Sequence, residues 1–411
     1  MKKVLFIVHE YYPYGSAITN CIEPIIKEMQ KQNIDITILT RRTKFSLKKF
    51  EIIDGINVYR INDWFNLSLD KINSSNIKIE KYFYRFILRT IGFYRNRIKK
   101  DSIGFFNLKR GIRKGNKIIK NNKQDTIISC SYPFSTHKIA YDLKQKNNIN
   151  WVSYQFDPHT FNHTLNFNLI NKRLHEEIKY FSKCDKIFLP KENFEENMKT
   201  KLCVLKDKYY PIDFALIKKI EYEDFSKNNE KIIFVFAGTF YENIRMPNNM
   251  LDFFKNINLN YELHLYYIAE KQIEDVLIDY QKILKDKLIL HNNKSKKECD
   301  EALNNANIII NVGNNIANQT PSKVFELISL RKPIINFYSI KNDTSKKVLI
   351  NYPLVYNIYQ EYSKDVIKDF ELFCKNNKYK KLSYEKIKEN YKTSTEIAQE
   401  FINEVNKCNE K

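Results

Sequence analysis

Short apolar runs, many of them rich in Val and Ile, alternate with stretches of helical spacing, and this alternation restricts the possible folds more than any other feature. The runs lie at residues 4–9, 34–39, 126–129, 151–156 and 186–189, and again at residues 232–237, 261–268, 287–291, 306–312 and 333–337. Runs that are apolar almost throughout are typical of parallel strands buried on both faces. Two such series predict an α/β fold of two doubly wound domains.

A polar stretch at residues 227–230 separates the two series, and the wider segment 211–230 is the expected hinge. We expect a first domain over residues 1–212 and a second over residues 225–382. The remaining residues, 383–411, have helical spacing with apolar side chains at Ile397, Phe401 and Val405. Such an amphipathic helix must pack on an apolar surface elsewhere in the chain.

Cysteine usage and hydropathy favour a reduced, cytoplasmic compartment. The seven cysteines are scattered and never in a Cys-x-x-Cys spacing, which argues against both a disulfide framework and a zinc site. No apolar run approaches the roughly 18–20 residues of a membrane span. The first apolar run is only five residues long before His9 and Glu10 interrupt it, which favours a buried strand over a secretion signal.

Three of the eight glycines, Gly15, Gly238 and Gly313, follow expected strands directly or within one loop. In an open α/β sheet, ligands bind outside the carboxyl ends of the strands, where glycine lets the backbone approach the ligand closely. Glycines that only form tight turns are the alternative for each position alone. The repetition of the pattern favours ligand-binding loops.

The segment from Asn311 to Ile335 carries the clearest candidate site. A strand ends before Gly313, and we expect Thr320 to cap a helix whose first residue is Pro321. Ser322 and Lys323 would then offer backbone N–H groups to an anion at the positive end of the helix dipole. The helix is apolar except for a stripe that includes Lys323 and Glu326.

A lysine at the helix start and a carboxylate one turn later suit a nucleoside diphosphate. The cation would contact phosphate, and Glu326 would accept hydrogen bonds from the ribose hydroxyls. The alternative is a surface pair of Lys323 with Glu326, which contributes about 0.2–0.5 kcal/mol. Arg245, which follows Gly238 and precedes Pro247, adds a second cation near a helix start. Two cations on one diphosphate would stabilise the charge that develops as a glycosidic bond breaks.

At this level the sequence resembles the family 4 glycosyltransferases of the GT-B fold, in particular bacterial enzymes of surface-polysaccharide synthesis. The resemblance rests on KVLFIVHEYYPYGSAITN, DTIISCSYPFSTHKIA, IIFVFAGTFYENIR and, most specifically, PSKVFELISLRKPII. It implies two Rossmann-like domains that face an interdomain cleft. It also implies that the last helix, within residues 383–411, returns to the N-terminal domain.

The resemblance assigns roles to matching positions. Glu326 matches the second glutamate of the family's Glu–seven residues–Glu motif, which binds the donor ribose, and Arg245 matches the basic residue that holds the diphosphate. The implied donor contacts are Gly15, Ser16, Gly238, Thr239, Arg245, Gly313, Asn318, Thr320, Ser322, Lys323 and Glu326.

Two positions depart from the family. Asn318 replaces the first glutamate of the motif, and Thr239 stands where many members have a second arginine. Because of these changes, the resemblance does not identify the donor sugar. The family often has a functional Asp or His after the strand at residues 151–156, so Asp157 and His159 join Arg245 and Lys323 as candidate catalytic residues. A solvated loop residue is the alternative for His159.

The implied activity is a retaining, hexosyl or N-acetylhexosaminyl transferase that takes sugar from a UDP-linked donor to a glycan acceptor, itself lipid-linked. No Asp-x-Asp sequence is present, so we expect neither a metal ion nor a cofactor. A nucleotide-sugar epimerase of the same fold and a non-enzymatic protein that binds anionic polymers remain alternatives.

Positive charge is concentrated in one segment. The chain has a formal net charge of +21, and residues 68–123 hold sixteen Lys and Arg against three acidic residues. Residues 78–100 mix basic with aromatic side chains, which suits a helix in a membrane interface. We therefore expect residues 78–123 to bind an anionic membrane surface on the cytoplasmic side. An ordinary solvated face is the alternative, and the absence of a nucleic-acid-binding motif argues against nucleic acid.

Overall fold

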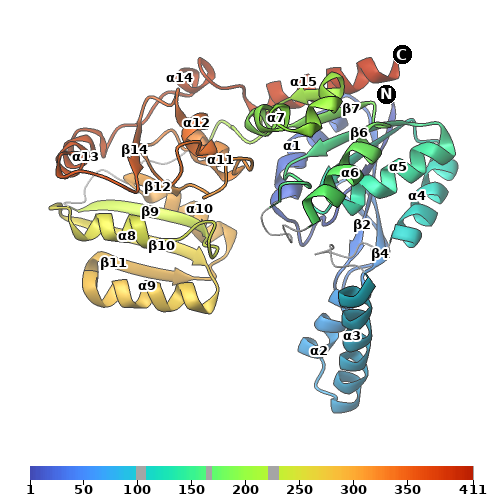
Figure 1. Cartoon of the computed structure of the whole chain (residues 1–411), viewed down its shortest axis with the longest axis horizontal. Coiled ribbons are helices and arrows are strands. Elements are labelled where there is room, and N and C mark those ends of the chain that lie inside the picture. The colour runs from blue at the N-terminus through green and yellow to red at the C-terminus, as the bar shows by residue number, and fades with distance from the viewer. Residues whose placement is uncertain (99–107, 163–168, 221–230, 411) are drawn as a thin grey trace. The chain divides into compact units, whose positions relative to one another are not determined.

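The computed structural model describes residues 1–98, 108–162, 169–220 and 231–410. The chain forms two compact units, an N-terminal unit of Met1–Ala215 with Ser394–Lys411, and a C-terminal unit of Leu216–Thr393 (Figure 1). Each unit is a predominantly parallel sheet with helices, which confirms the predicted fold class of two doubly wound α/β domains.

The N-terminal sheet has the order β3-β4-β2-β1-β5-β6-β7-β8, and only β3 runs antiparallel to its neighbour. Its strands are β1 (Lys3–Ile7), β2 (Asp35–Arg42), β3 (Phe50–Ile53), β4 (Ile56–Asn62), β5 (Thr126–Ser131), β6 (Asn150–Gln155), β7 (Lys186–Leu189) and β8 (Tyr209–Pro211). Its helices are α1 (Ala17–Lys31), α2 (Trp64–Ser74), α3 (Lys78–Ile98), α4 (Leu108–Asn122), α5 (Ser135–Asn147), α6 (Ile170–Phe181), α7 (Lys191–Met198), the 3₁₀ helix η2 (Lys201–Lys208) and α15 (Ser394–Asn409). The direction of strand succession reverses between β1 and β5, and such a reversal is where doubly wound sheets bind ligands.

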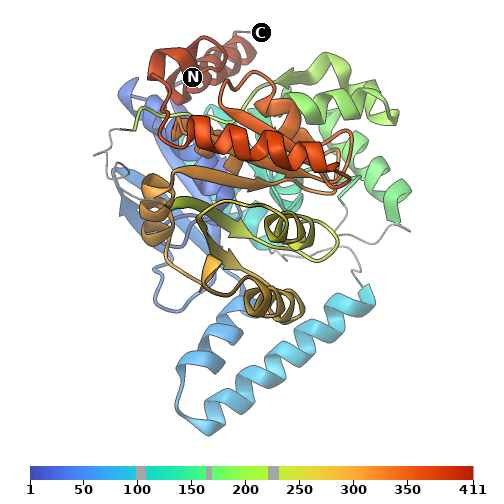
Figure 2. The ribbon, with the colours of Figure 1, turned by 90° about the vertical axis from the view of Figure 1, so that its left-hand side faces the viewer.

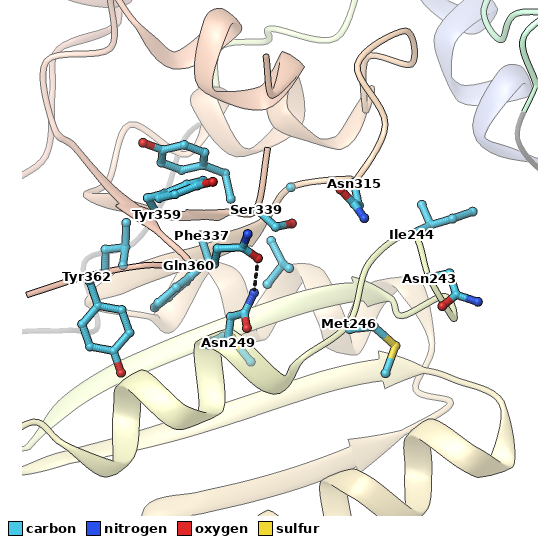
Figure 3. A pocket seen from close by; sticks show the side chains of 15 residues that line it. Asn243, Ile244, Met246, Asn249, Asn315, Phe337, Ser339, Tyr359, Gln360 and Tyr362 are labelled. Carbon is cyan, nitrogen blue, oxygen red and sulfur yellow. Dashed lines mark hydrogen bonds between the residues drawn. The ribbon is translucent and has the colours of Figure 1, made fainter. Parts of the chain in front are cut away.

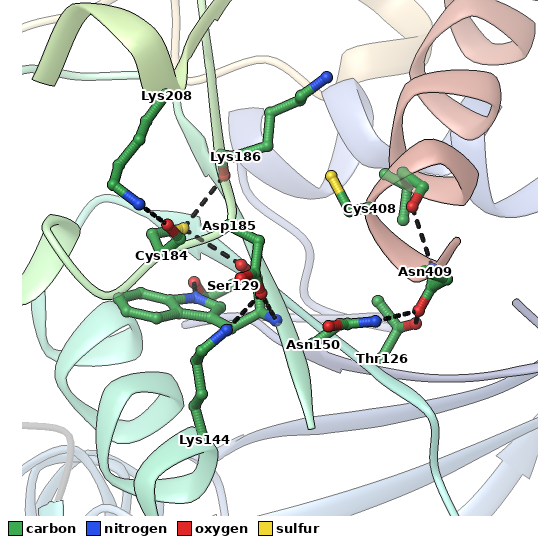
Figure 4. A network of polar contacts seen from close by, with 12 residues as sticks. Thr126, Ser129, Lys144, Asn150, Cys184, Asp185, Lys186, Lys208, Cys408 and Asn409 are labelled. Atoms are coloured by element: carbon green, nitrogen blue, oxygen red, sulfur yellow. Dashed lines mark hydrogen bonds and ion pairs between the residues drawn. The ribbon is translucent and has the colours of Figure 1, made fainter. Parts of the chain in front are cut away.

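The last helix, α15, belongs to the N-terminal unit, where it packs on α1. The ring of Phe401 is buried between Tyr154 of β6 and Phe188 of β7. At the end of the helix, the Asn409 side chain accepts hydrogen bonds from Asn150 and Thr126, at 2.6 and 3.0 Å (Figure 4). The amphipathic pattern of the tail therefore serves to complete this core.

The C-terminal sheet is parallel throughout, with the order β11-β10-β9-β12-β13-β14. Its strands are β9 (Ile232–Thr239), β10 (Tyr261–Ile268), β11 (Leu288–Asn292), β12 (Ile308–Val312), β13 (Ile334–Tyr338) and β14 (Val355–Tyr359). Its helices are α8 (Asn248–Lys255), α9 (Lys271–Leu284), the 3₁₀ helix η3 (Lys285–Lys287), α10 (Lys296–Asn305), α11 (Lys323–Ser329), α12 (Thr344–Leu349), α13 (Lys364–Asn377) and α14 (Tyr384–Lys388). The reversal point here lies between β9 and β12.

Helices α2 and α3 form a pair that projects from the end of β4, as Figures 1 and 2 show. Asp63 caps α2 by accepting hydrogen bonds from the backbone N–H groups of Phe65 and Asn66. None of the helices in the described residues combines the length and the apolarity needed to cross a membrane.

Candidate functional site

The loops after β9 and β12 lie side by side, because these two strands are paired at the reversal point of the C-terminal sheet. Arg245 in the first loop donates from Nε to Oδ1 of Asn314 in the second, at 3.0 Å. The backbone N–H of Asn315 donates to the carbonyl of Ile244, at 2.6 Å. The side chain of Arg245 is therefore fixed by both loops. Burial lowers the pKa of its guanidinium, although an arginine stays protonated at neutral pH.

Gly238 and Thr239 are the last residues of β9, and Arg245 is connected to this strand end as well. Its Nη1 donates to the carbonyl oxygen of Thr239 at 3.5 Å, a long contact. In the second loop, Asn318 is half-buried on the way from β12 to α11. The structure thus brings Gly238, Thr239, Arg245 and the Gly313 loop together.

Asp343 is a member of this group that the sequence analysis missed. Its side chain is 1% exposed. Oδ1 accepts a hydrogen bond from the Lys346 backbone N–H at 2.6 Å, and Oδ2 has no hydrogen-bond partner among the described residues. Burial raises the pKa of this carboxyl to about 6, although the Lys346 N–H and the nearby Arg245 favour its ionised form. The Asp-Thr-Ser sequence at 343–345, a helix-capping signal, could have identified it.

Gly313 lies directly against the carboxylate of Asp343. A Cβ atom on Gly313 would lie 2.2 Å from Oδ2 of Asp343, far inside van der Waals contact. The backbone at the end of β12 therefore packs against the carboxylate of Asp343, the N-cap residue of α12.

Glu326 on α11 lies between two lysines. Its Oε2 is 2.9 Å from Lys323 Nζ and 3.7 Å from Lys296 Nζ of α10. Burial opposes ionisation of Glu326, but the two lysines outweigh it, so its pKa is lowered. The pair of Lys323 with Glu326, considered above as an alternative, is present, and Lys296 extends it to a cluster of three charges that the sequence analysis did not foresee.

The predicted cap at Thr320 is wrong. Helix α11 begins at Lys323, two residues after Pro321, and the N-cap residue is Ser322, whose side chain makes no capping hydrogen bond. The N–H groups of Val324 and Phe325 already donate to the carbonyls of Pro321 and Ser322 in a tightened first turn. With seven residues and these N–H groups used, α11 offers less to an anion than the sequence predicted.

In the N-terminal unit, Gly15 lies in the exposed connection from β1 to α1. Ser16 is the N-cap residue of α1, and its backbone N–H donates to Oγ1 of Thr19 at 3.1 Å. The hydroxyl of Thr19 in turn donates to the carbonyl of Glu10 at 3.0 Å, which ties the helix start to the segment after β1. These hydrogen bonds therefore fix the chain on the C-terminal side of the glycine loop.

Asp157 and His159 follow β6, two strands from β1 in the sheet. Asp157 is half-buried. His159 is 6% exposed and its ring stacks on Phe134, with the centroids 4.0 Å apart. Its Nε2 is 3.6 Å from Oε2 of Glu176. The alternative of a solvated loop histidine is therefore wrong, and the burial places His159 under the loop rather than on its surface.

A charged cluster at the same edge of this sheet also escaped the sequence analysis. Arg41 at the end of β2 forms ion pairs with Glu10 and with Asp63, the latter at 2.9 Å. Burial, together with the positive charge of Arg41, lowers the pKa of His9 to about 2, so this imidazole is neutral. These residues come from three different strand ends, and only the fold brings them together.

The basic segment divides into two helices with different surroundings. In α3, Ile79, Tyr82, Phe83 and Phe86 are exposed by 56–82% and share one face. In α4, by contrast, the apolar side is buried against α5, and Gly115 leaves room for Leu143 of that helix. The side chains of residues 93–98 and all of residues 99–107, which include part of the basic segment, lie outside the described residues.

Comparisons with known proteins identify the fold. No protein-family model matches the sequence, and no curated protein matches it. Among solved structures, sucrose-phosphate synthase of Thermosynechococcus elongatus is similar at a TM-score of 0.67 and 11% identity, with 99% of both chains covered. A glycosyltransferase of Rickettsia africae ESF-5 is similar at a TM-score of 0.64 and 9% identity, covering 99% of this chain and 98% of that one.

Anabaena Alr3699/HepE, solved in complex with UDP-glucose, is similar at a TM-score of 0.65 and 7% identity, with 99% of this chain and all of that chain covered. Sequence identities this low support a similarity of fold alone. The two doubly wound sheets and these full-length similarities agree, and the chain has the GT-B fold.

Proposed function

We propose that this chain is a glycosyltransferase that takes a sugar from a UDP-linked donor held by its C-terminal unit. The observation that carries the proposal is the fixed position of Arg245 at the reversal point of the C-terminal sheet, hydrogen-bonded to the next loop at 3.0 Å. A cation held in advance at the carboxyl ends of parallel strands suits a diphosphate. The similarity to a protein solved with UDP-glucose supports UDP as the nucleotide.

In the proposed reaction, Arg245 and Lys323 contact the diphosphate oxygens. As the bond from the sugar to the diphosphate breaks, negative charge grows on the leaving diphosphate, and the two cations stabilise it without a metal ion. Arg245 needs little reorganisation because both of its loops already hold it. The transfer retains the configuration of the sugar, as the resemblance to family 4 implies.

Glu326 binds the ribose in this proposal. Its lowered pKa keeps it a carboxylate, which can accept hydrogen bonds from two adjacent hydroxyls. Lys323 and Lys296 hold the carboxylate while the site has no nucleotide. When a nucleotide binds, Lys323 can turn from Glu326 towards phosphate, so that one contact replaces another.

The acceptor belongs to the N-terminal unit in this proposal, with Asp157 at the carboxyl edge of its sheet. Gly15 and Ser16, at the exposed start of α1 on the same edge, contribute donor contacts, as the resemblance implies. His159, being buried against Phe134, acts as a positioning residue for the loop of Asp157.

We further propose that α3 attaches the enzyme to the cytoplasmic face of a membrane, where a lipid-linked acceptor for a surface glycan would lie. Its exposed face carries Tyr82, Phe83 and Phe86, which suit the headgroup region. A row of basic residues, Lys78, Lys81, Arg85 and Arg89, runs beside this face, and each adds about 1 kcal/mol near an anionic leaflet. The basic face of α4 has no such exposed apolar stripe.

Thermal-shift measurements with UDP-, GDP- and ADP-linked sugars test the donor proposal. We expect UDP and at least one UDP-sugar to raise the Tm, because a ligand that binds only the folded state stabilises it. Arg245→Ala should remove most of this shift, and Lys285→Ala, a cation outside the site, should not. If no UDP compound changes the Tm, or if Arg245→Ala keeps the full shift, the proposal is wrong.

Flotation with anionic vesicles tests the role of α3. Replacing Lys78, Lys81, Arg85 and Arg89 with Gln should lower the vesicle affinity at least a hundredfold, since each charge contributes about 1 kcal/mol. The matched control replaces the exposed Lys109, Arg113, Lys117 and Lys120 of α4 and removes the same charge. Equal losses in both variants would mean that net charge, and not α3, binds the vesicles.

A further inference from the structure

A pocket of about 240 Å³ lies in the C-terminal unit, at the carboxyl ends of β12, β13 and β14 and beside the first turn of α8 (Figure 3). Arg245, Lys323, Glu326 and Asp343 are not among its lining residues. None of its lining side chains, all within the described part of the chain, carries a charge. A phosphate group would find no cation among the lining side chains, so the lining suits a neutral ligand better than an anion.

Amides make up half of the polar side chains in the lining, and hydroxyl groups the other half. Asn243, Asn249, Asn315 and Gln360 each bring one carboxamide, which is both a donor and an acceptor. Asn249 Nδ2 donates to Gln360 Oε1 across the pocket at 3.3 Å, a long bond that a ligand can replace (Figure 3). The side chains of Asn243 and Asn315 have no hydrogen-bond partner among the described residues, so they remain able to bind a ligand.

The remaining walls are aromatic and apolar. Tyr359 and Phe337 line the pocket together with Met246, and Ser339 adds a hydroxyl. A sugar ring has hydroxyl groups at its edges and C–H groups on its faces. The carboxamides of the pocket can hydrogen-bond to such hydroxyl groups, and its apolar walls can pack against such C–H groups. The volume is below the roughly 300–1,000 Å³ of pockets for larger ligands, so it suits one ring rather than a nucleotide.

The pocket uses the other side of the two loops that hold Arg245. Arg245 turns towards Asn314, whereas its neighbours Ile244 and Met246 face the pocket. In the second loop, Gly313 and Asn315 line the pocket on either side of Asn314. Neighbouring residues of the same two loops thus point in different directions. Arg245 and Asn314 bind each other, and the residues beside them line the neutral pocket.

We propose that this pocket is a binding site for a single neutral sugar residue. The site goes beyond the proposed diphosphate and ribose contacts, and its binding does not depend on them. The same chemistry fits two sources, the sugar of the donor and a sugar residue of a glycan, and the experiment below distinguishes them.

Saturation-transfer NMR on the full chain, with free glucose, galactose, N-acetylglucosamine and glucuronate as probes, tests the proposal. We expect at least one neutral sugar to bind with a Kd of about 1–10 mM and glucuronate to bind more weakly. Asn249→Ala with Gln360→Ala should weaken the binding about tenfold, since each removes a neutral hydrogen bond. Gln272→Ala, an exposed glutamine on α9, is the matched control and should change nothing.

The second arm repeats the titration in saturating UDP-glucose, with UDP alone as the control. Displacement of the sugar by UDP-glucose but not by UDP would assign the pocket to the donor, and simultaneous binding of the sugar and UDP-glucose would assign it to a glycan. Glu326→Ala should leave the Kd of the sugar unchanged, and the pocket variants should leave the Kd of UDP unchanged. The experiment can therefore reject the sugar pocket and the nucleotide site independently. The proposal falls if no neutral sugar binds, if glucuronate binds equally well, or if Asn249→Ala with Gln360→Ala keeps the wild-type Kd.

Discussion

Replacing Glu326 with alanine removes the carboxylate assigned to the ribose and leaves the surrounding helix intact. The carboxylate has two structural contacts, Lys323 at 2.9 Å and Lys296 at 3.7 Å, and its side chain is 25% exposed. A pair of this kind on a helix surface contributes about 0.2–0.5 kcal/mol to stability. The variant should therefore fold and unfold with a Tm within about 2 °C of the wild type.

The effect on UDP binding should be much larger. Two hydrogen bonds from ribose hydroxyls to a carboxylate contribute about 1.5–3 kcal/mol each. The wild type must weaken the contacts of Glu326 with the two lysines to make them, which costs up to about 1 kcal/mol for two such partly exposed pairs. A net loss of about 2–5 kcal/mol remains, and this corresponds to roughly 30- to 5,000-fold in Kd.

Titration calorimetry with UDP measures this difference directly. Glu326→Gln should lie between the wild type and Glu326→Ala, because the amide keeps one acceptor oxygen. Glu301→Ala on α10 is the control, since Glu301 is paired with Lys297 at 3.8 Å and its removal deletes the same charge. A Kd for Glu326→Ala within twofold of the wild type would refute the assignment of the ribose to this carboxylate.

Three further variants test the packing described above. Gly313→Ala should lower the free energy of unfolding by about 1–3 kcal/mol, because its Cβ would lie 2.2 Å from Asp343 Oδ2, and urea unfolding should show that Asp343→Ala recovers most of the loss; simple additivity would contradict the contact. Asp343→Asn should exceed the wild type by about 1 kcal/mol at about pH 4.5 and by up to about 3 kcal/mol at about pH 8, because a folded-state pKa raised from 3.8 to about 6 makes the wild type lose stability as pH rises through this range; a difference that is independent of pH would count against it. Phe401→Ala should cost about 3–5 kcal/mol in the same assay, since the buried ring fills the space between Tyr154 and Phe188; a loss below about 1 kcal/mol would show that α15 is not part of the core.

The two sheets were predictable because their central strands are apolar almost throughout. Runs such as residues 232–237 and 306–312 can only be buried on both faces, and the structure has β9 and β12 at these places. The outer strands are different. In β14, Val355 to Asn357 are only partly buried, and this edge strand was not predicted. The hairpin of β3 and β4 was missed although Asp54-Gly55 is a strong turn signal, with φ of 49° and 79°.

Candidate residues that a local pattern marks could be named from the sequence, and those that meet only in the fold could not. Arg245 lies between the end of β9 and the start of α8, and Glu326 lies in the first turn of α11. Lys296 reaches Glu326 from another helix, and Asp343 reaches Gly313 over thirty positions of sequence, which no local spacing encodes. The cap at Thr320 was misplaced because the tightened turn at Pro321 moves the start of the helix to Lys323. The functional roles of these residues stay predictions.

Because α15 completes the core of a unit that otherwise ends at Ala215, the N-terminal unit cannot finish folding until the ribosome has made α15. At roughly 5–20 residues per second, the remainder of the chain takes roughly 10–40 s to follow. During this interval the apolar surface that awaits Phe401 is open, next to Tyr154 and Phe188. A chaperone that binds nascent chains would have its longest opportunity at this surface, and a stop codon shortly before Ser394 would leave the surface uncovered for the lifetime of the protein.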